Sequence, residues 1–452
     1  MNEPQPLHQV IQRQIRTSMT AKIVMIALVV LLCQIPVLMV DGLISRRQNL
    51  ARSVEQEIAS KWGYRQKISG PILAIPLFRQ NKKGEIERST FFAVPQNLRI
   101  TGTLYPEMRY RGIYEIVLYR SRIKLTGDIV FREPGSQWQA SPEKSRLIIG
   151  ISDLQGLSAI SGKYNDTVLT PVTGLCDDAP FLQGFSLPLN PRQNGTFEIN
   201  FDLNGCRELL FTMVGRQTEL SLESTWPTPS FRGAFLPTQR NVTADGFTAT
   251  WSVSEFNRDL AATWIGDSTA INQRFEFEND QRPYDCSAGV MLLQAADTYL
   301  QTNRAVEYAI LVFIIVLMAM LIAEKITGVW VHPLQYFITA LSLVLFYTLT
   351  LAISEHTSFG TAYLISAAAL TGMSIFYSAL IYRRPTAAIC MGSATAIAYA
   401  AIYVILQLED YALLTGSILL FILLTVLMYF TGKINRLPAE AGSTDCPAPP
   451  AN

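Results

Sequence analysis

Long apolar segments separated by short polar breaks fill the C-terminal third of the chain. Five of them lie between residues 305 and 430, and another lies near the N-terminus. The hydrocarbon core of a bilayer is about 30 Å thick, so an α-helix needs about 20 mostly apolar residues to cross it. None of these segments keeps the polar face of a soluble amphipathic helix. We therefore expect transmembrane helices at 23–40, 306–323, 334–353, 363–382, 386–406 and 411–430.

The polar breaks predict the orientation of these helices, because Lys and Arg are enriched in short cytoplasmic loops. Alternate breaks contain Lys or Arg, and the intervening breaks contain neither. The basic positions are Arg13, Arg16, Lys22, Lys325, Arg383, Arg384, Lys433 and Arg436; the intervening breaks hold Glu355-His356 and Glu409-Asp410. We expect a cytoplasmic N-terminus (1–22), a cytoplasmic tail (431–452) and a region on the outer side of the membrane at 41–304.

The first apolar segment could be a membrane anchor or a cleaved signal peptide. It has 18 uncharged residues at 23–40, which exceeds the ~7–15 residues of a usual signal-peptide core. No small-x-small cleavage pattern follows it. These features favour the uncleaved anchor.

The region between the first and second spans is polar and predominantly β in pattern. Residues 42–63 are rich in helix formers and are expected to extend the first span, and 295–307 is expected to lead as a helix into the second. Between them, 197–203, 219–223 and 247–253 alternate apolar and polar residues, as half-buried strands do. We predict an α-helical polytopic membrane protein with a large β-rich, antiparallel sandwich-like extracytoplasmic domain. One sandwich or two linked β lobes would both fit.

Composition agrees with this division. Of 452 residues, 49% are hydrophobic and only 16% are charged, and the net charge is +1. Charges concentrate in 41–304 and nearly vanish from the apolar segments. Nucleic-acid binding would require a concentrated basic face, so we expect no nucleic-acid partner, whereas membrane lipids are expected partners.

Candidate catalytic chemistry is sparse. The three histidines are His8, His332 and His356, so the β-rich region cannot form Ser–His–Asp or Cys–His arrangements or a His-containing zinc site. Phosphate-binding and dinucleotide-binding motifs are absent from the sequence. We therefore expect no enzyme activity, no cofactor and no metal.

Polar residues at the ends of the span 334–353 are the candidate functional positions. They are His332, Gln335, Tyr336, Glu355 and His356. Ionisable groups within a membrane cost free energy, so such positions usually suggest a function. At the membrane interface the same residues can instead serve as helix caps or as an aromatic belt. We expect no charge to be buried within a span, which argues against an ion-coupled transporter.

Three cysteines lie in the region predicted to be on the outer side, Cys176, Cys206 and Cys286. An oxidising compartment permits one disulfide among them, and three pairings are open. A Cys176–Cys206 bridge is the candidate, and it would contribute roughly 3–4 kcal/mol. Three unpaired buried thiols are the alternative.

Several stretches spread over nearly the whole chain carry a family resemblance. They include GLISRRQ at 42–48, SGPILAIP at 69–76, PSFRGAFLP at 229–237, RAVEYAIL at 304–311 and HPLQY at 332–336. With these stretches the chain resembles the CreD family of inner-membrane proteins, which is associated with cell-envelope integrity in Gram-negative bacteria. The resemblance implies a stress-regulated envelope role and supplies no catalytic residues.

Two functional classes follow. The first is a non-enzymatic inner-membrane protein that contributes to envelope integrity or the envelope stress response, whose β domain meets a periplasmic or envelope protein partner. The alternative is a lipid-handling or transport factor that acts through the helix bundle. The sequence does not predict an oligomeric state.

Overall fold

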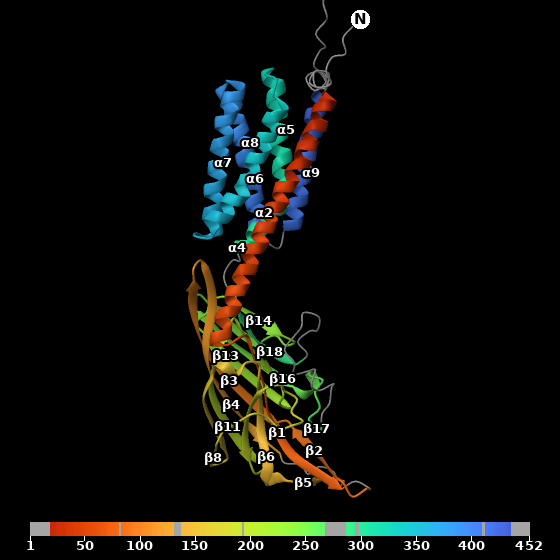
Figure 1. The fold of residues 1–452 in the computed structure, drawn as a ribbon, viewed down its shortest axis with the longest axis vertical. Coiled ribbons are helices and arrows are strands. Elements are labelled where there is room, and N and C mark those ends of the chain that lie inside the picture. Colours follow the sequence, from red (N-terminus) through yellow and green to blue (C-terminus); the bar gives the residue numbers. More distant parts are fainter. Residues whose placement is uncertain are drawn as a thin grey trace, which may run out of the picture. The chain divides into compact units, whose positions relative to one another are not determined.

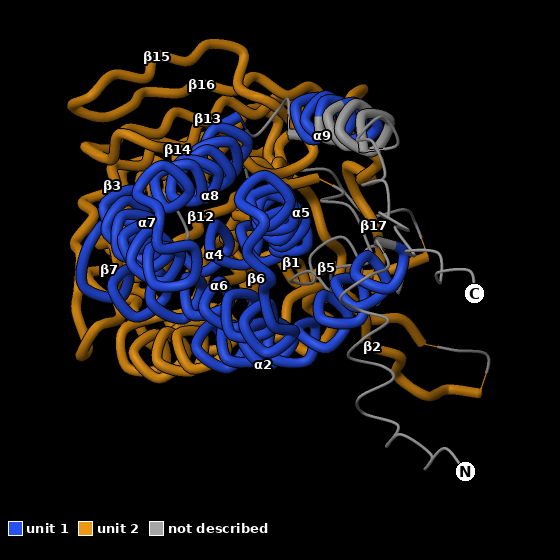
Figure 2. Tube along the Cα trace, turned by 90° about the horizontal axis from the view of Figure 1, so that it is seen from above, with its two compact units in different colours: residues 1–48, 296–452 blue, residues 49–295 orange. Residues whose placement is uncertain are grey.

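A computed structural model describes residues 19–80, 83–130, 137–191, 194–266, 286–293, 298–408 and 412–434. The chain divides into two compact units (Figure 2), residues 1–48 with 296–452, and residues 49–295. The first unit is helical and the second, here called the β domain, is built mainly of strands. The predicted architecture of a polytopic membrane protein with a large β-rich domain is confirmed.

The helices of the first unit follow the apolar segments (Figure 1). Five described helices, α2, α5, α6, α7 and α8, are long and apolar enough to cross a membrane by length and composition. The helix bounds are α2 (Met19–Trp62), α4 (Thr298–Glu307), α5 (Ala309–Thr327), α6 (Pro333–Ser354), α7 (Phe359–Tyr382), α8 (Pro385–Gln407) and α9 (Ala412–Ile434). Arg13, Arg16, Arg436 and Glu409-Asp410 lie outside the described residues.

Local chemistry explains where several of these helices begin and end. Proline occupies the first position of α6 and α8, where its fixed φ suits a helix and its missing N–H is not needed. Gly328 ends α5 in the left-handed conformation, with φ of 69°, as C-terminal glycines commonly do. The helix expected over 295–307 does not run directly into the second span, because α4 and α5 are separated at Tyr308.

Aromatic side chains form the centre of the helical unit. The Phe346 ring of α6 stacks on Tyr399 of α8, with centroids 4.1 Å apart, and meets the edge of Tyr363 of α7 at 4.9 Å. All three side chains are fully buried. Such aromatic contacts add about 0.5–1.5 kcal/mol beyond area burial, so they fix α6, α7 and α8 against one another.

The described strands of the β domain form two sheets, of ten and eight strands. The ten-stranded sheet has the order β14-β18-β12-β1-β6-β10-β9, with β2 and β5 paired to β1 and β17 paired to β2; the eight-stranded sheet has the order β15-β16-β13-β3-β4-β11-β7-β8. The bounds in the first sheet are β1 (Gln66–Gln80), β2 (Ile86–Ala93), β5 (Gln139–Ala140), β6 (Ser145–Ile151), β9 (Val172–Thr173), β10 (Gly184–Leu189), β12 (Glu208–Thr212), β14 (Pro229–Gly233), β17 (Thr263–Ile265) and β18 (Ser287–Leu292). Those in the second are β3 (Asn97–Arg111), β4 (Tyr114–Ile129), β7 (Leu157–Tyr164), β8 (Thr167–Leu169), β11 (Gly195–Cys206), β13 (Gln217–Ser224), β15 (Gln239–Thr243) and β16 (Gly246–Ser254).

The sheets are not wholly antiparallel. Strand β1 pairs in parallel with β12, and β3 pairs in parallel with β13. Both parallel pairs join strands far apart in the sequence, and each is flanked by antiparallel pairs. The two sheets thus repeat the same pairing pattern, which strand periodicity alone could not reveal.

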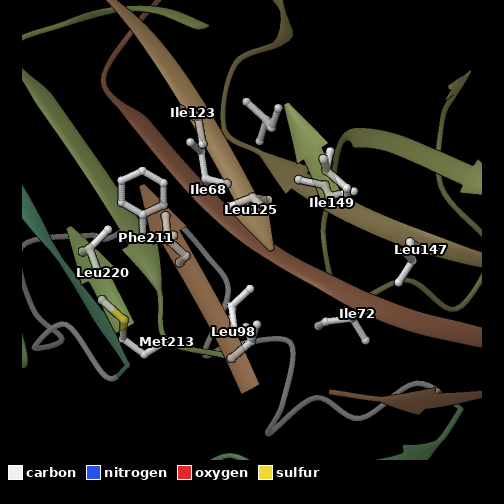
Figure 3. Packing of buried hydrophobic residues seen from close by; sticks show 14 of the residues in the cluster. Ile68, Ile72, Leu98, Ile123, Leu125, Leu147, Ile149, Phe211, Met213 and Leu220 are labelled. Atoms are coloured by element: carbon white, nitrogen blue, oxygen red, sulfur yellow. The ribbon is translucent and has the colours of Figure 1, made fainter. Parts of the chain in front are cut away.

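A single hydrophobic core lies between the sheets (Figure 3). Ile68, Ile72 and Leu147 come from the ten-stranded sheet, and Leu98 and Leu125 come from the eight-stranded sheet. All five are almost completely buried, and burial of each aliphatic side chain contributes about 1.5–3 kcal/mol. The β domain is therefore one sandwich and not two lobes.

The C-terminal turns of α2 belong to the β domain and cover one end of the outer face of the eight-stranded sheet. Their apolar face meets a small cluster made of Val54, Ile58, Ala59, Trp62, Ile116, Leu118 and Cys206. The Trp62 indole N–H donates to the Tyr119 carbonyl oxygen at 3.3 Å. The guanidinium of Arg109 lies 4.6 Å from the centre of the Trp62 ring. Apolar packing and a cation–π contact together hold the end of this helix on the sheet.

Candidate functional site

His332 and Gln335 form the N-terminal cap of α6. The His332 ring accepts a hydrogen bond from the Leu334 N–H at 3.2 Å, and the Gln335 side chain accepts one from the His332 N–H at 2.9 Å. This reciprocal pattern is a capping box, which satisfies backbone donors that the first turn leaves free. The structure thus gives both residues a structural role.

Tyr336 joins a buried ion pair. Its hydroxyl donates to a carboxylate oxygen of Glu324 on α5 at 2.9 Å. The other carboxylate oxygen of Glu324 accepts a hydrogen bond from the Lys22 ammonium on α2. Lys22 and Glu324 are each only 4% exposed, and Tyr336 is completely buried. Three helices are tied together at this point.

This ion pair was not expected from the sequence. Lys22 belongs to the segment expected to be cytoplasmic (1–22), and Glu324 falls one residue beyond the predicted span 306–323. Both side chains are nevertheless buried, where they pair with each other and Tyr336 supplies a further hydrogen bond. Isolated charges would be very costly at this burial, and a paired, hydrogen-bonded set is tolerated. The partners are 302 residues apart in the sequence, so no local signal could have linked them.

Glu355 takes part in a second ion pair with α2. Its carboxylate lies 3.4 Å from the Arg47 guanidinium, and the Glu355 side chain is 11% exposed whereas that of Arg47 is 42% exposed. His356 is exposed. The five candidate residues therefore do not converge: two cap a helix, two belong to separate ion pairs, and His356 lies on the surface of the helical unit.

A group of buried hydroxyls, missed by the sequence reading, lies in the same bundle. Tyr347 and Thr350 on α6, Ser366 on α7 and Tyr399 on α8 are at most 1% exposed. Within the described ranges, none of these four hydroxyls has a hydrogen-bond partner. The Tyr363 hydroxyl, in contrast, donates to the Tyr399 carbonyl oxygen at 2.8 Å. Serine, threonine and tyrosine in an apolar helix do not show from the sequence which hydroxyls are buried without a hydrogen-bond partner, so these four positions could not be predicted.

The candidate Cys176–Cys206 disulfide is not formed. Both residues are free thiols in the structure. Cys206 lies in the small cluster under α2, whereas Cys176 packs against the main core of the β domain. Burial raises the pKa of the Cys206 thiol to about 12, and the neighbouring Glu55 carboxylate adds to the shift; burial raises the pKa of Cys176 to about 11. Neither thiol is activated as a nucleophile.

The outer face of the eight-stranded sheet is a polar surface. Paired charges cross its strands: Arg99 lies 2.9 Å from Glu219, and Lys124 lies 3.1 Å from Glu198. Hydroxyl side chains lie between them, and the register places Thr101 beside Ser221 and Ser221 beside Thr250. The sheet thus presents hydrogen-bonding groups strand after strand.

Two hollows open on this face. One, of about 330 Å³, lies over the middle of β3, the end of β13 and the start of β16. The other, of about 270 Å³, lies over the first residues of β3 and β13. Tyr105 and Glu223 line the larger hollow, whereas Arg99 and Glu219 line the smaller. In the part of the chain that the structure describes, no three His, Cys, Asp or Glu side chains gather as a metal site would require.

Comparison with known proteins assigns the family. The family model described as "Inner membrane protein CreD" matches residues 18–436. The inner membrane protein CreD of Escherichia coli (strain K12) is 31% identical over 425 residues, which cover 90% of this chain and 91% of that protein. Both matches include the helical unit and the β domain. The chain therefore belongs to the CreD family of inner membrane proteins.

Proposed function

We propose that this protein is a non-enzymatic inner-membrane protein that contributes to cell-envelope integrity or the envelope stress response, with the β domain as its interaction module. In this proposal the helical unit anchors the chain, both termini are cytoplasmic and residues 41–304 are periplasmic. The alternation of basic and acidic breaks supports this orientation.

The single observation that carries the proposal is the outer face of the eight-stranded sheet. Interaction surfaces need directional groups in fixed positions, and a sheet supplies them because strand register holds each side chain in place. The Arg99–Glu219 and Lys124–Glu198 pairs and the hollows all occur on this face. A polar surface that served solubility alone would not require these hollows.

In-cell photocrosslinking tests the proposal. A photoreactive amino acid placed at Thr101 or Thr250, both exposed on this face, should form adducts with an envelope protein or with cell-wall material. The matched control is Thr173 of β9, which is exposed at the edge of the ten-stranded sheet and should give no such adduct. Adducts with lipids alone at Thr101 and Thr250 would contradict the interaction-module proposal.

The second candidate function, a lipid-handling or transport factor, is favoured by the buried hydroxyls of Tyr347, Thr350, Ser366 and Tyr399. Polar groups inside a membrane bundle are costly unless they serve packing or a ligand. In a strain that depends on the protein for envelope integrity, Tyr347→Phe with Ser366→Ala should abolish complementation if the bundle is the working site. Unimpaired complementation by this double variant, at normal protein levels, would leave the β domain as the working part.

A further inference from the structure

The larger hollow of the eight-stranded sheet lies where three parts of the β domain meet. The middle of β3 supplies Thr103 and Tyr105, and the end of β13 supplies Glu223. The β15–β16 hairpin supplies Asn241 and Asp245. Figure 1 labels three of the strands around the hollow, β3, β13 and β16; Asn241 and Thr243 belong to the adjoining strand β15.

Strand register aligns four of the lining side chains in one row. Asn241 pairs with Thr248, Thr248 with Glu223, and Glu223 with Thr103. Directly paired residues point to the same face of a sheet, so the row presents an amide, a hydroxyl, a carboxylate and a second hydroxyl in sequence. Neighbouring strands are about 4.8 Å apart, a spacing close to the length of one sugar ring in a β-1,4-linked chain.

The hairpin that closes one side of the hollow depends on a glycine. Gly246 has φ of 142°, and a Cβ atom there would lie 2.1 Å from the carbonyl oxygen of Ser224. Only glycine permits this approach of the hairpin to β13. The Thr243 hydroxyl donates to the Gly246 carbonyl oxygen at 3.2 Å and closes the two-residue turn that carries Asp245. The wall that holds Asn241 and Asp245 is therefore fixed by backbone geometry.

The lining selects among ligand classes. Among the described residues around the hollow none is Lys or Arg, and two carry carboxylates, Glu223 and Asp245, so the hollow disfavours an anion. The hydrophobic residues of the floor, Leu104 and Phe247, are buried beneath the sheet surface, so an apolar ligand would find little to contact. What remains accessible is a set of acceptors and donors beside one aromatic ring, that of Tyr105, which is 51% exposed.

That combination fits a carbohydrate. The hydroxyls of a sugar donate to carboxylates and exchange hydrogen bonds with amide and hydroxyl groups. An exposed aromatic ring offers a flat apolar surface for the C–H face of the sugar, with low conformational entropy cost. We propose that this hollow binds a neutral oligosaccharide, with Tyr105 as the stacking platform and Glu223, Asn241 and Asp245 as hydrogen-bonding residues.

The position of Glu223 supports this assignment. Its carboxylate accepts a hydrogen bond from the Thr103 hydroxyl at 2.6 Å through one oxygen. This bond orients the carboxylate, and among the described residues the other oxygen is available to a ligand. Arg120 is the cross-strand neighbour of Tyr105, and its guanidinium lies 5.3 Å from the centre of the Trp62 ring at the end of α2. The C-terminal end of α2 therefore supports the part of the sheet that carries Tyr105.

The test uses the full-length protein, purified in a detergent without a sugar headgroup so that detergent cannot occupy the site. The probe is the tetramer of N-acetylglucosamine, titrated by calorimetry and by saturation-transfer NMR. We expect saturable binding and contact of the sugar protons with a tyrosine ring. Tyr105→Ala should weaken binding about tenfold, as loss of one aromatic anchor does, and Glu223→Gln should weaken it as well.

Tyr110→Ala is the matched control, because Tyr110 is an exposed tyrosine (66%) on the same strand that does not line the hollow. Its affinity should equal that of the unchanged protein, and circular dichroism should show that all variants are folded. No binding of the tetramer at millimolar concentration, or equal losses in the two tyrosine variants, would overturn the proposal. Binding of spermidine that Glu223→Gln abolishes, without tetramer binding, would identify a cation site instead.

This inference rests on the proposed function only for the source of the sugar, which a periplasmic face would meet in the cell wall. The two can fail separately. Adducts from Thr101 or Thr250 without tetramer binding would remove the carbohydrate site and leave the interaction module. Tetramer binding sensitive to Tyr105→Ala, with no adducts in cells, would leave the site and remove the module.

Discussion

The Lys22–Glu324 and Arg99–Glu219 pairs join the same kinds of groups in opposite surroundings. In the helical unit the two side chains are 5% and 4% exposed, whereas in the β domain they are 70% and 52% exposed. Water screens the exposed pair, which contributes little on its own. The buried pair is not screened, so loss of one partner leaves a charge without compensation. The helical unit therefore uses charge to fix helix packing, and the β domain uses it to shape a surface.

The largest effect is expected from breaking the buried pair. Lys22→Met should lower the free energy of unfolding by about 3–5 kcal/mol, because the Glu324 carboxylate would remain buried without its cation. Unfolding of the purified protein in mixed micelles measures the change. The double variant Lys22→Met/Glu324→Gln should recover most of the loss, since no charge remains. Equal destabilisation in the single and double variants would contradict the comparison.

A smaller effect is expected at Tyr336, whose hydroxyl donates to the same carboxylate. Tyr336→Phe should destabilise the protein by about 1.5–3 kcal/mol, the range for hydrogen bonds to charged groups. Tyr382→Phe is the matched control, because the Tyr382 hydroxyl donates to a neutral acceptor, the Met320 carbonyl oxygen, at 2.9 Å. It should cost only about 0.5–1.5 kcal/mol. The reverse order of the two costs would show that Glu324 is not charged.

Two neighbouring tyrosines separate bonded from unpartnered hydroxyls. Tyr363→Phe should cost about 1 kcal/mol, because it removes the hydrogen bond to the Tyr399 carbonyl oxygen. Tyr347→Phe should be neutral or stabilising, because within the described ranges its hydroxyl has no partner. The same unfolding measurement compares them. A loss at Tyr347 as large as that at Tyr363 would mean that a bound polar molecule satisfies the Tyr347 hydroxyl.

The smallest effect is expected at the surface of the sheet. Arg99→Ala and Glu219→Ala should each change the free energy of unfolding by less than about 1 kcal/mol, and the coupling between them should fall as salt is raised. A double-mutant cycle at low and high ionic strength measures it. Coupling comparable to that of Lys22 and Glu324 would remove the distinction between the two regions.

Much of the helical unit could be predicted from the sequence, because a membrane-spanning helix must satisfy its backbone internally and be apolar along its length. The strands at 197–203, 219–223 and 247–253 were predictable for a similar local reason, the two-residue alternation that β11, β13 and β16 show. The pairing of the strands could not be predicted, because alternation shows which side chains of a strand are buried but not which strand lies beside it. The parallel pairs β1–β12 and β3–β13 are contacts of this kind.

The candidate site divides in the same way. The spacing of His332, Pro333 and Gln335 is local and already matched a helix cap, the role the structure gives it. Glu355 and Tyr336 stand out in the sequence as polar positions at the ends of a span, but their partners Arg47 and Glu324 depend on tertiary packing. The hollow at Tyr105 and Glu223 depends on register between strands more than 100 residues apart, as the Thr103–Glu223 pairing shows.

The sidedness of the β domain is the measurement that tests the central claim most directly. Thr101→Cys lies on the outer face of the eight-stranded sheet, and Ile326→Cys lies at the end of α5. Spheroplasts are treated with a membrane-impermeant maleimide before and after permeabilisation, with the unchanged chain as the background for native thiols. We expect residue 101 to be labelled before permeabilisation and residue 326 only after it. Labelling of residue 101 only after permeabilisation would place the β domain in the cytoplasm and contradict the proposal that it is a periplasmic interaction module.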